Sequence, residues 1–513
     1  MSAVTRTKTE SDLGTIFSTA RMRRLSIAVL GALLLALAFP KAGVAWFAPL
    51  GAAALFLSWE HVSWKRAFGL GWFAGLIFFS ISFWWWSTTI KQDVGLFAYA
   101  AAIAGGAIEA VAIGAAGALA VLVRARTVPW LAPLGVACAF TATEWLRSIG
   151  VNGVPFAQLG YTQADTPLRV FAAYLGTSGV TLAVCLLAAY LADAVYRRTW
   201  RPFAVCVVAL AIAWTLAWEF WPARTLSQPS IPVAAVQGNI AQSLKWQPRM
   251  LAESIDRYTS LTQSVIARDP QLIVWPETVI PVPGGLNQNP MLLARFTQLA
   301  RDAHATIVAG SIDIHNGGAY NALYVFTPYG LEATYDKRQL VPFAEFFPGK
   351  NFLFWLPYIG SLNGGFSEGT VPGVYPTTSG LTIAPLICWE STFGDLAFDQ
   401  VRRGAQLLVI STDDAWFGTT SGPYQHAQIA QLRAVEFGMY VVRAAATGIS
   451  GIIAPDGTWT RRVGLEQLAV VNGKVGPPVG SFFSHIGPTP VFVLMVVIYA
   501  LLVLIPARQR HAP

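Results

Sequence analysis

The stretch LTIAPLICWESTFGD, residues 381–395, joins an apolar run to a polar segment through a single cysteine. The apolar run predicts a buried β-strand that ends at Ile387, and the residues after Cys388 predict a turn into a helix. A cysteine at the end of a strand is placed where a nucleophile can be presented at a sheet edge. The alternative is that Cys388 is a small buried thiol that packs as a hydrophobic residue.

The residues around this stretch, from 229 to 476, alternate between apolar strands and helices. Strands are predicted at 231–240, 271–278, 305–313, 321–328, 380–388, 405–412 and 448–455, and helices at 248–267, 290–303, 391–403 and 422–438. Alternation with near-continuous apolar strands predicts a layered α/β fold, and not a sandwich of short antiparallel strands.

The composition of the whole chain points to a membrane protein. Its 513 residues are 54% hydrophobic and only 12% charged, whereas soluble domains are about 25% charged. The long apolar runs fill 25–221 and 489–506, so we expect one large water-facing domain held between membrane spans. The net charge of +8 comes from basic residues beside apolar runs and not from one basic stripe, which argues against nucleic-acid binding.

The apolar runs predict seven membrane spans before the polar domain and one after it. They lie at 25–40, 44–59, 70–88, 96–123, 130–146, 170–196, 202–221 and 491–505. Clusters of Arg and Lys fall in alternate connections, so the positive-inside rule predicts cytoplasmic termini and an extracytoplasmic 225–488. The predicted parts are a tail (1–24), a seven-span membrane domain (25–222), a catalytic domain (229–476), a last span (489–506) and a second tail (507–513).

Two groups of residues in the membrane part allow more than one interpretation. Glu144 and Arg147 stand one turn apart at the end of a predicted span. Ionisable groups inside a membrane are candidates for function, but such a pair can also simply hold a helix end. Aromatic residues near the span ends predict an interfacial belt; they include Phe83, Trp84, Trp85, Trp86, Trp218 and Trp221.

Several polar residues of the 229–476 domain are candidates for chemistry. Glu277 follows an apolar strand directly after Pro276, and Lys337 and Glu345 flank a proline-containing turn. The carboxyl ends of strands are where sites assemble in α/β sheets. A thiol with a pKa near ~8.5 needs a base or a cation to react at neutral pH, which Glu277 and Lys337 could provide. Taken singly, each could equally be a helix cap or a surface charge.

The order of these motifs resembles the Glu-Lys-Cys triad of the nitrilase superfamily. The motifs are WPET (275–278), DK (336–337), VPFAE (341–345) and CWE (388–390), supported by QGNIAQSLKW (237–246), DDAWFG (413–418) and GPYQHAQIAQLRAVE (422–436). Together with the predicted spans, the chain resembles the bacterial apolipoprotein N-acyltransferases from its first span to its last. This resemblance implies a multi-span α-helical membrane domain plus an extracytoplasmic nitrilase-like domain, an αββα sandwich.

The resemblance also implies the roles of individual residues. Cys388 would be the nucleophile, Glu277 the general base and Lys337 the stabiliser of the oxyanion. Supporting roles would fall to Glu345 beside the triad, to Trp389 and Glu390 in the nucleophile turn, and to Trp246 near the active site. The chain departs from the family where Asn-Asp commonly precedes AWFG, because Asp413 stands in place of the Asn.

The implied reaction is ping-pong acyl transfer at the outer face of the bacterial inner (cytoplasmic) membrane, with the catalytic domain in the periplasm. A phospholipid, typically phosphatidylethanolamine, would give an acyl chain to Cys388, and the α-amine of a diacylglyceryl-cysteine lipoprotein would then take it. No metal or organic cofactor is expected. We also expect the apolar segment 343–360 to form a mobile lid at the membrane surface. The alternatives are a membrane-anchored nitrilase-type amidase or hydrolase, and a transporter or scaffold without activity.

Overall fold

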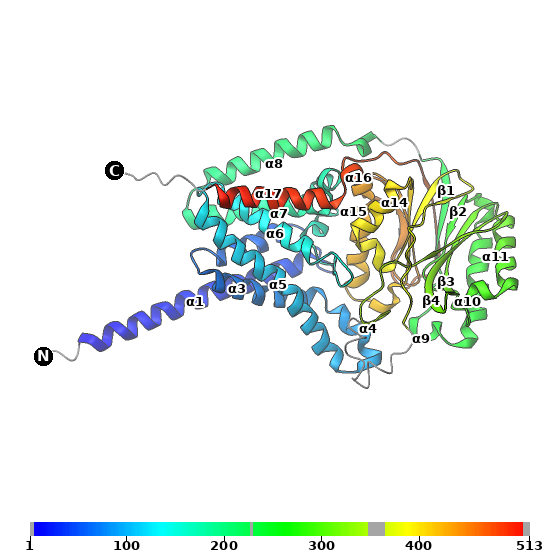
Figure 1. Cartoon of the computed structure of the whole chain (residues 1–513), viewed down its shortest axis with the longest axis horizontal. Coiled ribbons are helices and arrows are strands. Elements are labelled where there is room, and N and C mark those ends of the chain that lie inside the picture. The colour runs from blue at the N-terminus through cyan, green and yellow to red at the C-terminus, as the bar shows by residue number, and fades with distance from the viewer. Residues whose placement is uncertain (1–4, 226–228, 347–364, 506–513) are drawn as a thin grey trace.

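The computed structural model describes residues 5–225, 229–346 and 365–505. Figure 1 shows two parts side by side, a bundle of long helices and a layered domain of sheets and helices. The last helix of the described residues returns from the layered domain and lies against the bundle. The bundle therefore contains both the first and the last helices of the described chain.

Apolar helices build the bundle. They are α1 (Thr5–Ala38), α2 (Phe47–Ser58), α3 (Trp64–Ser82), α4 (Trp85–Val94), α5 (Phe97–Arg126), α6 (Ala132–Leu146), α7 (Ala172–Arg197), α8 (Arg201–Glu219) and α17 (Pro488–Leu504). Small residues let α3 and α5 approach closely: a Cβ on Gly71 would lie 2.6 Å from the Ile113 carbonyl oxygen, and one on Gly75 2.9 Å from the Ala110 Cβ. Such small-residue contacts are typical of helix packing in membranes.

The helices differ in their ability to cross a membrane. By length and composition, three described helices qualify, at 97–126, 167–197 and 201–219, or four if the bent pair α3–α4 counts as one. The predicted continuous run 70–88 is wrong in one respect, because the helix breaks after Ser82 and resumes at Trp85 with a bend of 58°. The predicted number of spans stays a prediction.

Two six-stranded sheets form the centre of the layered domain. The first has the order β12-β1-β2-β3-β4-β5 and the second β11-β10-β9-β8-β7-β6. The strands of the first sheet are β1 (Ile231–Gln237), β2 (Leu272–Val274), β3 (Thr306–His315), β4 (Gly318–Thr327), β5 (Gly330–Asp336) and β12 (Ala469–Val475). Those of the second are β6 (Tyr375–Pro376), β7 (Thr382–Ile387), β8 (Leu407–Thr412), β9 (Val441–Ala445), β10 (Ser450–Ile453) and β11 (Trp459–Val463).

The sheets face one another across a core of aliphatic side chains that includes Val274, Val308, Ile383 and Val409. Helices α10 (Pro248–Gln263) and α11 (Pro290–Asp302) cover the outer face of the first sheet, and α14 (Gly394–Arg402) and α15 (Gly422–Phe437) that of the second. Sheets covered on both faces explain why the central strands are apolar throughout. The predicted αββα sandwich is confirmed.

Aromatic side chains join the two parts of the molecule. Trp389, just after Cys388, stacks on Phe156 of the bundle with ring centroids 5.2 Å apart, and Trp85 packs edge-on against Phe417 at 4.6 Å. Phe83, Trp85 and Trp221 are buried, with exposures of 0%, 2% and 3%. The predicted interfacial belt is therefore wrong for these three residues, because they pack inside the protein.

Candidate active site

The ends of three strands bring the predicted triad together. Glu277 lies shortly after β2, Lys337 directly follows β5, and Cys388 directly follows β7. The Nζ atom of Lys337 lies 3.0 Å from Oε1 of Glu277 and 2.8 Å from Oε1 of Glu345. The structure thus gathers two carboxylates around one buried lysine.

Glu277 is held by donors on both of its oxygens. Oε1 accepts a hydrogen bond from Nδ2 of Asn321 at 2.6 Å, and Oε2 accepts one from the backbone N–H of Asp413 at 2.8 Å. Burial raises the pKa of Glu277, but the cations Lys337 and Lys245 outweigh burial and bring it below the ordinary value. Glu277 is therefore a carboxylate with fixed orientation, which a general base requires.

Lys337 is a permanent cation at this position. Burial lowers its pKa, but the carboxylates of Glu277 and Glu345 outweigh burial and raise the pKa above its usual range. Glu345 also accepts a hydrogen bond from the backbone N–H of Val341 at 2.8 Å, which fixes its carboxylate beside the lysine. A buried, oriented ammonium group can stabilise negative charge that develops nearby.

Cys388 occupies a strained position at the start of a 3₁₀ turn, Cys388–Thr392. Its φ of +48° lies in the left-handed region that residues with a side chain rarely adopt. Burial and the charge of Glu277 raise the pKa of the Cys388 thiol well above its ordinary value, while Lys337 opposes them. The resting residue is a thiol, so it needs a base at the moment of reaction.

Glu390 ties the nucleophile turn to the segment that carries Lys337. One carboxylate oxygen accepts from the backbone N–H of Ile387 at 2.7 Å, and the other from Arg338 N at 2.6 Å, Gln339 N at 3.3 Å and the Tyr335 hydroxyl at 3.0 Å. Burial raises the pKa of Glu390 to about 7, although its hydrogen bonds oppose the shift. Glu390 therefore joins the two segments through its hydrogen bonds, and its role in the reaction stays a prediction.

The two tryptophans singled out from the sequence lie in different surroundings. Trp389 is buried and points toward the helical bundle, where it stacks on Phe156, so it supports the turn from behind. Trp246 is 48% exposed, and the ammonium of Lys245 lies 5.8 Å from its ring centroid. Since Lys245 in turn contacts the Glu277 segment, Trp246 lies at the edge of the site.

Lys245 is a site residue that sequence reasoning missed. It is 6% exposed, and its Nζ donates to the Glu277 carbonyl oxygen at 3.1 Å, the Thr278 hydroxyl at 2.5 Å and Oδ2 of Asp413 at 2.5 Å. Asp413 thus pairs with a lysine, which explains how an acid is accommodated where the family commonly has Asn. Asn321 was missed as well. Lys245 lies inside the motif 237–246, and Asn321 begins the predicted strand 321–328. Nothing in the sequence indicated that either side chain would contact Glu277.

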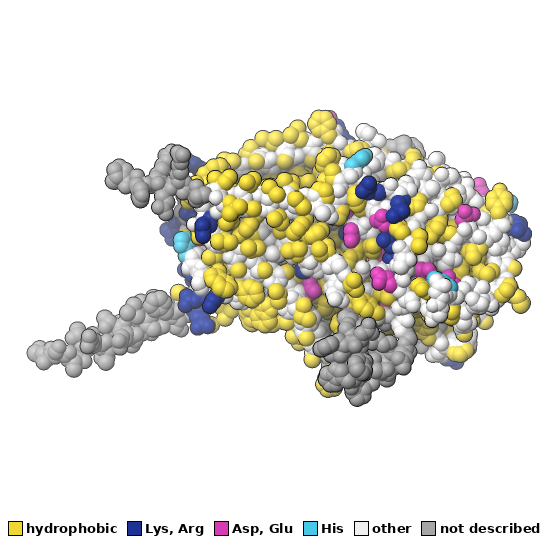
Figure 2. All heavy atoms as spheres, in the orientation of Figure 1, with side chains coloured by type: hydrophobic (Ala, Val, Ile, Leu, Met, Phe, Trp, Pro, Cys, Tyr) yellow, Lys and Arg dark blue, Asp and Glu magenta, His cyan; other side chains and the backbone are white. Residues whose placement is uncertain are grey.

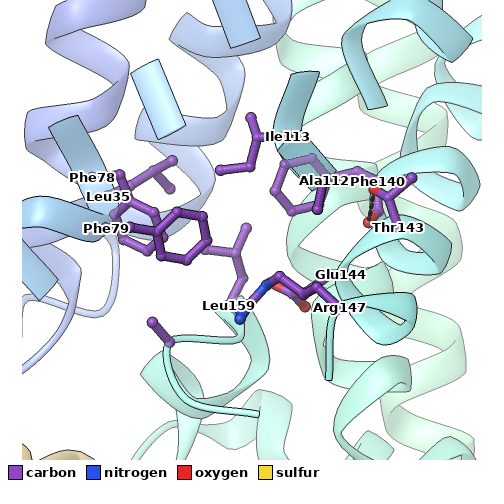
Figure 3. A pocket seen from close by; sticks show the side chains of 11 residues that line it. Leu35, Phe78, Phe79, Ala112, Ile113, Phe140, Thr143, Glu144, Arg147 and Leu159 are labelled. Carbon is purple, nitrogen blue, oxygen red and sulfur yellow. Dashed lines mark hydrogen bonds between the residues drawn. The ribbon is translucent and has the colours of Figure 1, made fainter. Parts of the chain in front are cut away.

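Glu144 and Arg147 do not form the ion pair with each other that their spacing allows. Arg147 pairs with Glu109 at 3.3 Å and donates to the carbonyl oxygens of Val154 at 2.7 Å and Phe156 at 2.9 Å. Glu144 accepts from Leu159 N and from the Thr181 hydroxyl, each at 2.8 Å. Figure 3 shows both side chains at a small cavity in the bundle, with Leu159 close by. Together they hold the loop that carries Phe156.

One group with the composition of a metal site occurs among the described residues. Ligand atoms of Asp313, His315 and Asp336 lie within 4.8 Å of one another. Nε2 of His315 lies 2.9 Å from Oδ2 of Asp336, and the His315 ring stacks on Tyr320 with ring centroids 4.0 Å apart, so hydrogen bonding and packing account for the arrangement.

Most of the predicted lid at 343–360 lies outside the described residues, which exclude 347–364.

Comparison with known proteins assigns both parts of the chain. The sequence profile of the family described as "Carbon-nitrogen hydrolase" matches residues 232–476, and that of "Apolipoprotein N-acyltransferase N-terminal domain" matches residues 31–190. An apolipoprotein N-acyltransferase of Photobacterium profundum is 32% identical over 68% of this chain and 68% of its own length. One from Geobacter metallireducens is 32% identical over 90% of this chain and 91% of its own length. Among solved structures, Saccharomyces cerevisiae Nit3, a member of branch 10 of the nitrilase superfamily, is 20% identical with a TM-score of 0.39, covering 49% of this chain and 93% of its own.

Proposed function

The chain belongs to the apolipoprotein N-acyltransferase family, and we propose that Cys388 carries the acyl group during its reaction. The protein transfers a fatty acyl chain from a phospholipid to the α-amino group of the N-terminal diacylglyceryl-cysteine of apolipoproteins. The observation that carries the assignment of residues is the buried cluster in which Glu277 and Lys337 lie 3.0 Å apart and both act on the pKa of the Cys388 thiol.

In the first half-reaction, Glu277 takes the proton of the Cys388 thiol as the sulfur attacks the ester carbonyl of the phospholipid. A carbon–sulfur bond forms, and the carbonyl oxygen becomes an oxyanion that the ammonium of Lys337 stabilises. The intermediate then breaks the bond to the glycerol oxygen. That oxygen takes the proton from Glu277 and leaves as lysophospholipid, with the acyl chain held as a thioester.

In the second half-reaction, the α-amine of the lipoprotein attacks the thioester, a carbonyl group that amines attack readily. Glu277 accepts the proton that the amine loses, and Lys337 again faces the oxyanion. The carbon–sulfur bond breaks, the amide remains on the lipoprotein, and the thiolate of Cys388 recovers a proton from Glu277. Each cycle therefore returns the three residues to their starting protonation states.

The distribution of charge supports a location in the bacterial inner membrane with the catalytic domain in the periplasm. Figure 2 shows Lys and Arg side chains at the end of the bundle farthest from the sheets, and a broad hydrophobic face between that end and the sheet domain. Basic side chains favour the cytoplasmic side of a membrane. The catalytic domain then lies at the outer surface, where we propose phosphatidylethanolamine as the acyl donor.

Mass spectrometry of the purified protein in phospholipid nanodiscs tests this proposal. We expect an acyl adduct on Cys388 that disappears, with release of N-acyl peptide, when a diacylated lipopeptide is added. Cys388→Ala should abolish both the adduct and the product, whereas Cys206→Ala, which changes a buried thiol of α8, should retain them. Full transfer by Cys388→Ala would refute the assignment, and free fatty acid as the sole product would indicate the hydrolase alternative.

A further inference from the structure

A chain of buried polar groups lies behind Cys388 and has no part in the proposed proton transfers. Nδ1 of His426 lies 2.9 Å from Oδ1 of Asp414, and Nε2 of His426 lies 2.7 Å from the Ser391 hydroxyl. That hydroxyl donates to the carbonyl oxygen of Cys388 at 2.7 Å, and Nε2 lies 3.2 Å from the same oxygen. The chain therefore ends on the peptide group of the nucleophile itself.

Three separate elements supply this chain. Ser391 belongs to the turn that starts at Cys388, His426 to α15, and Asp414 to the segment after β8. His426 and Ser391 are 0% exposed and Asp414 is 1% exposed. Unsatisfied polar groups would be costly at such depth, so their mutual contacts fix these elements relative to one another.

Asp414 is itself fixed from the other side. Nη2 of Arg443 donates to Oδ2 of Asp414 at 2.6 Å, and the hydroxyl of Thr412 donates to Oδ1 at 3.0 Å. Burial raises the pKa of Asp414, but Arg443 and His426 lower it to about 2, so Asp414 is a carboxylate. Burial and Arg443 lower the pKa of His426, so the ring is neutral and its Nδ1 carries the proton that faces Asp414.

The arrangement of an acid, a histidine and a serine resembles the relay of serine hydrolases. Ser391 is fully buried and its hydroxyl is occupied by the Cys388 carbonyl and His426, so a substrate cannot reach it. A second nucleophile is therefore excluded. The Ser391 hydroxyl instead donates to the carbonyl oxygen of Cys388. Cys388 has a φ of +48°, a backbone conformation that persists only where its surroundings enforce it.

We propose that Asp414, His426 and Ser391 form a positioning unit that holds the Cys388 peptide in its left-handed conformation and so aims the sulfur at Glu277 and Lys337. The inference rests on the proposed function of Cys388 as the nucleophile. The three residues act through Cys388 and touch no substrate. Loss of the unit lets the turn relax, which lowers the rate of thioester formation without changing how the phospholipid binds.

His426→Phe tests the inference, because it fills a similar volume between the rings of Phe156 and Phe417 but removes both hydrogen bonds. We expect kcat for acyl-enzyme formation in phospholipid nanodiscs to fall at least tenfold with an unchanged KM. His426→Gln, whose side-chain amide can again hydrogen-bond to the Ser391 hydroxyl, should recover part of that loss. If His426→Phe fails to accumulate, Ser391→Ala interrupts the same chain and should show the same split between kcat and KM.

Gln400→Leu is the matched control. Gln400 is 0% exposed and donates to the carbonyl oxygen of Pro385 in β7, the strand that leads to Cys388. Its loss therefore removes a comparable buried hydrogen bond close to the nucleophile turn. We expect Gln400→Leu to lower the midpoint of thermal unfolding but to keep kcat. Equal kcat in His426→Phe and the wild-type enzyme, or a fall that Gln400→Leu reproduces, would overturn the positioning role. Absence of the Cys388 adduct in the wild-type protein would instead refute the proposed function.

Discussion

Replacing Lys245 by Met removes a buried cation from beside the general base. The side chains of Lys245 and Asp413 are 5% and 1% exposed, and Nζ of Lys245 lies 2.5 Å from Oδ2 of Asp413. Removing one partner of a buried ion pair typically costs about 3–5 kcal/mol, because the other charge stays buried without compensation. We therefore expect Lys245→Met to lower the free energy of unfolding by about 3–5 kcal/mol, measured by denaturant unfolding in detergent micelles.

The same substitution should change the pH dependence of the reaction. Lys245 is one of the two cations that hold the pKa of Glu277 below its ordinary value, so its loss raises that pKa. A depressed carboxylate pKa keeps the base ionised as the pH falls, and the acidic limb of kcat/KM reports that ionisation in the free enzyme. In Lys245→Met we expect the acidic limb to move to higher pH.

The double variant Lys245→Met/Asp413→Asn separates the charge effect from simple loss of packing. It removes both charges, so we expect it to regain most of the lost stability and to return the acidic limb toward the wild-type position. Lys474→Met, at an exposed position of β12, should change stability by less than about 0.5 kcal/mol. If Lys245→Met is as stable as Lys474→Met and its acidic limb does not move, our account of the ion pair is refuted.

Further predictions concern three residues that support the nucleophile turn directly or through the Phe156 loop. Glu390→Gln should slow acyl-enzyme formation roughly 5- to 150-fold, since a buried donor left without an acceptor costs about 1–3 kcal/mol. Because the pKa of Glu390 is raised to about 7 from an ordinary 4.5, wild-type stability should fall by about 3 kcal/mol as the pH rises from 4.5 to 7, and Glu390→Gln should lack this contribution. Phe156→Leu should destabilise the contact with Trp389 by about 0.5–1.5 kcal/mol, detected as slower thioester formation at unchanged phospholipid KM. Glu144→Gln should lower the unfolding free energy by about 1–3 kcal/mol, because either Leu159 N–H or the Thr181 hydroxyl loses its acceptor; unchanged unfolding would contradict this.

The sequence predicted the sandwich well because its central strands are buried on both faces. Long apolar runs such as 271–278 and 405–412 can be recognised without any tertiary information. Among the strands longer than two residues it missed β5, β9, β11 and β12. GLEATYD, WTRRV and AVVNGKV carry polar residues on partly exposed strands, and VVRAA is a short run interrupted by the buried Arg443. It also missed the break between α3 and α4, because the apolar run continues across the bend and composition alone carries no sign of it.

For the site, too, the residues that lie in recognisable local motifs could be predicted, and their distant contacts could not. Glu277 and Cys388 stand at the ends of recognisable strands, and together with Lys337 they lie in motifs that resemble a known triad, so their convergence could be expected. The partners of Asp413 and Glu390 could not be predicted, because Lys245 lies 168 positions from Asp413 and Tyr335 lies 55 positions from Glu390. Such contacts depend on how the sheets pack against each other, and this packing cannot be deduced from the spacing of residues in one sequence.

The stacking of Trp389 on Phe156 has a consequence for how the protein can be divided. Trp389, Phe393 and Phe417 belong to the same continuous core as the helices of the bundle. A fragment containing only residues 229–476 would present these rings to water directly behind the nucleophile, and it would lose the surface on which the Cys388 turn rests. The nitrilase-like part of this enzyme is therefore not a transferable module, and a chimera between relatives will need a matched interface as well as an intact triad.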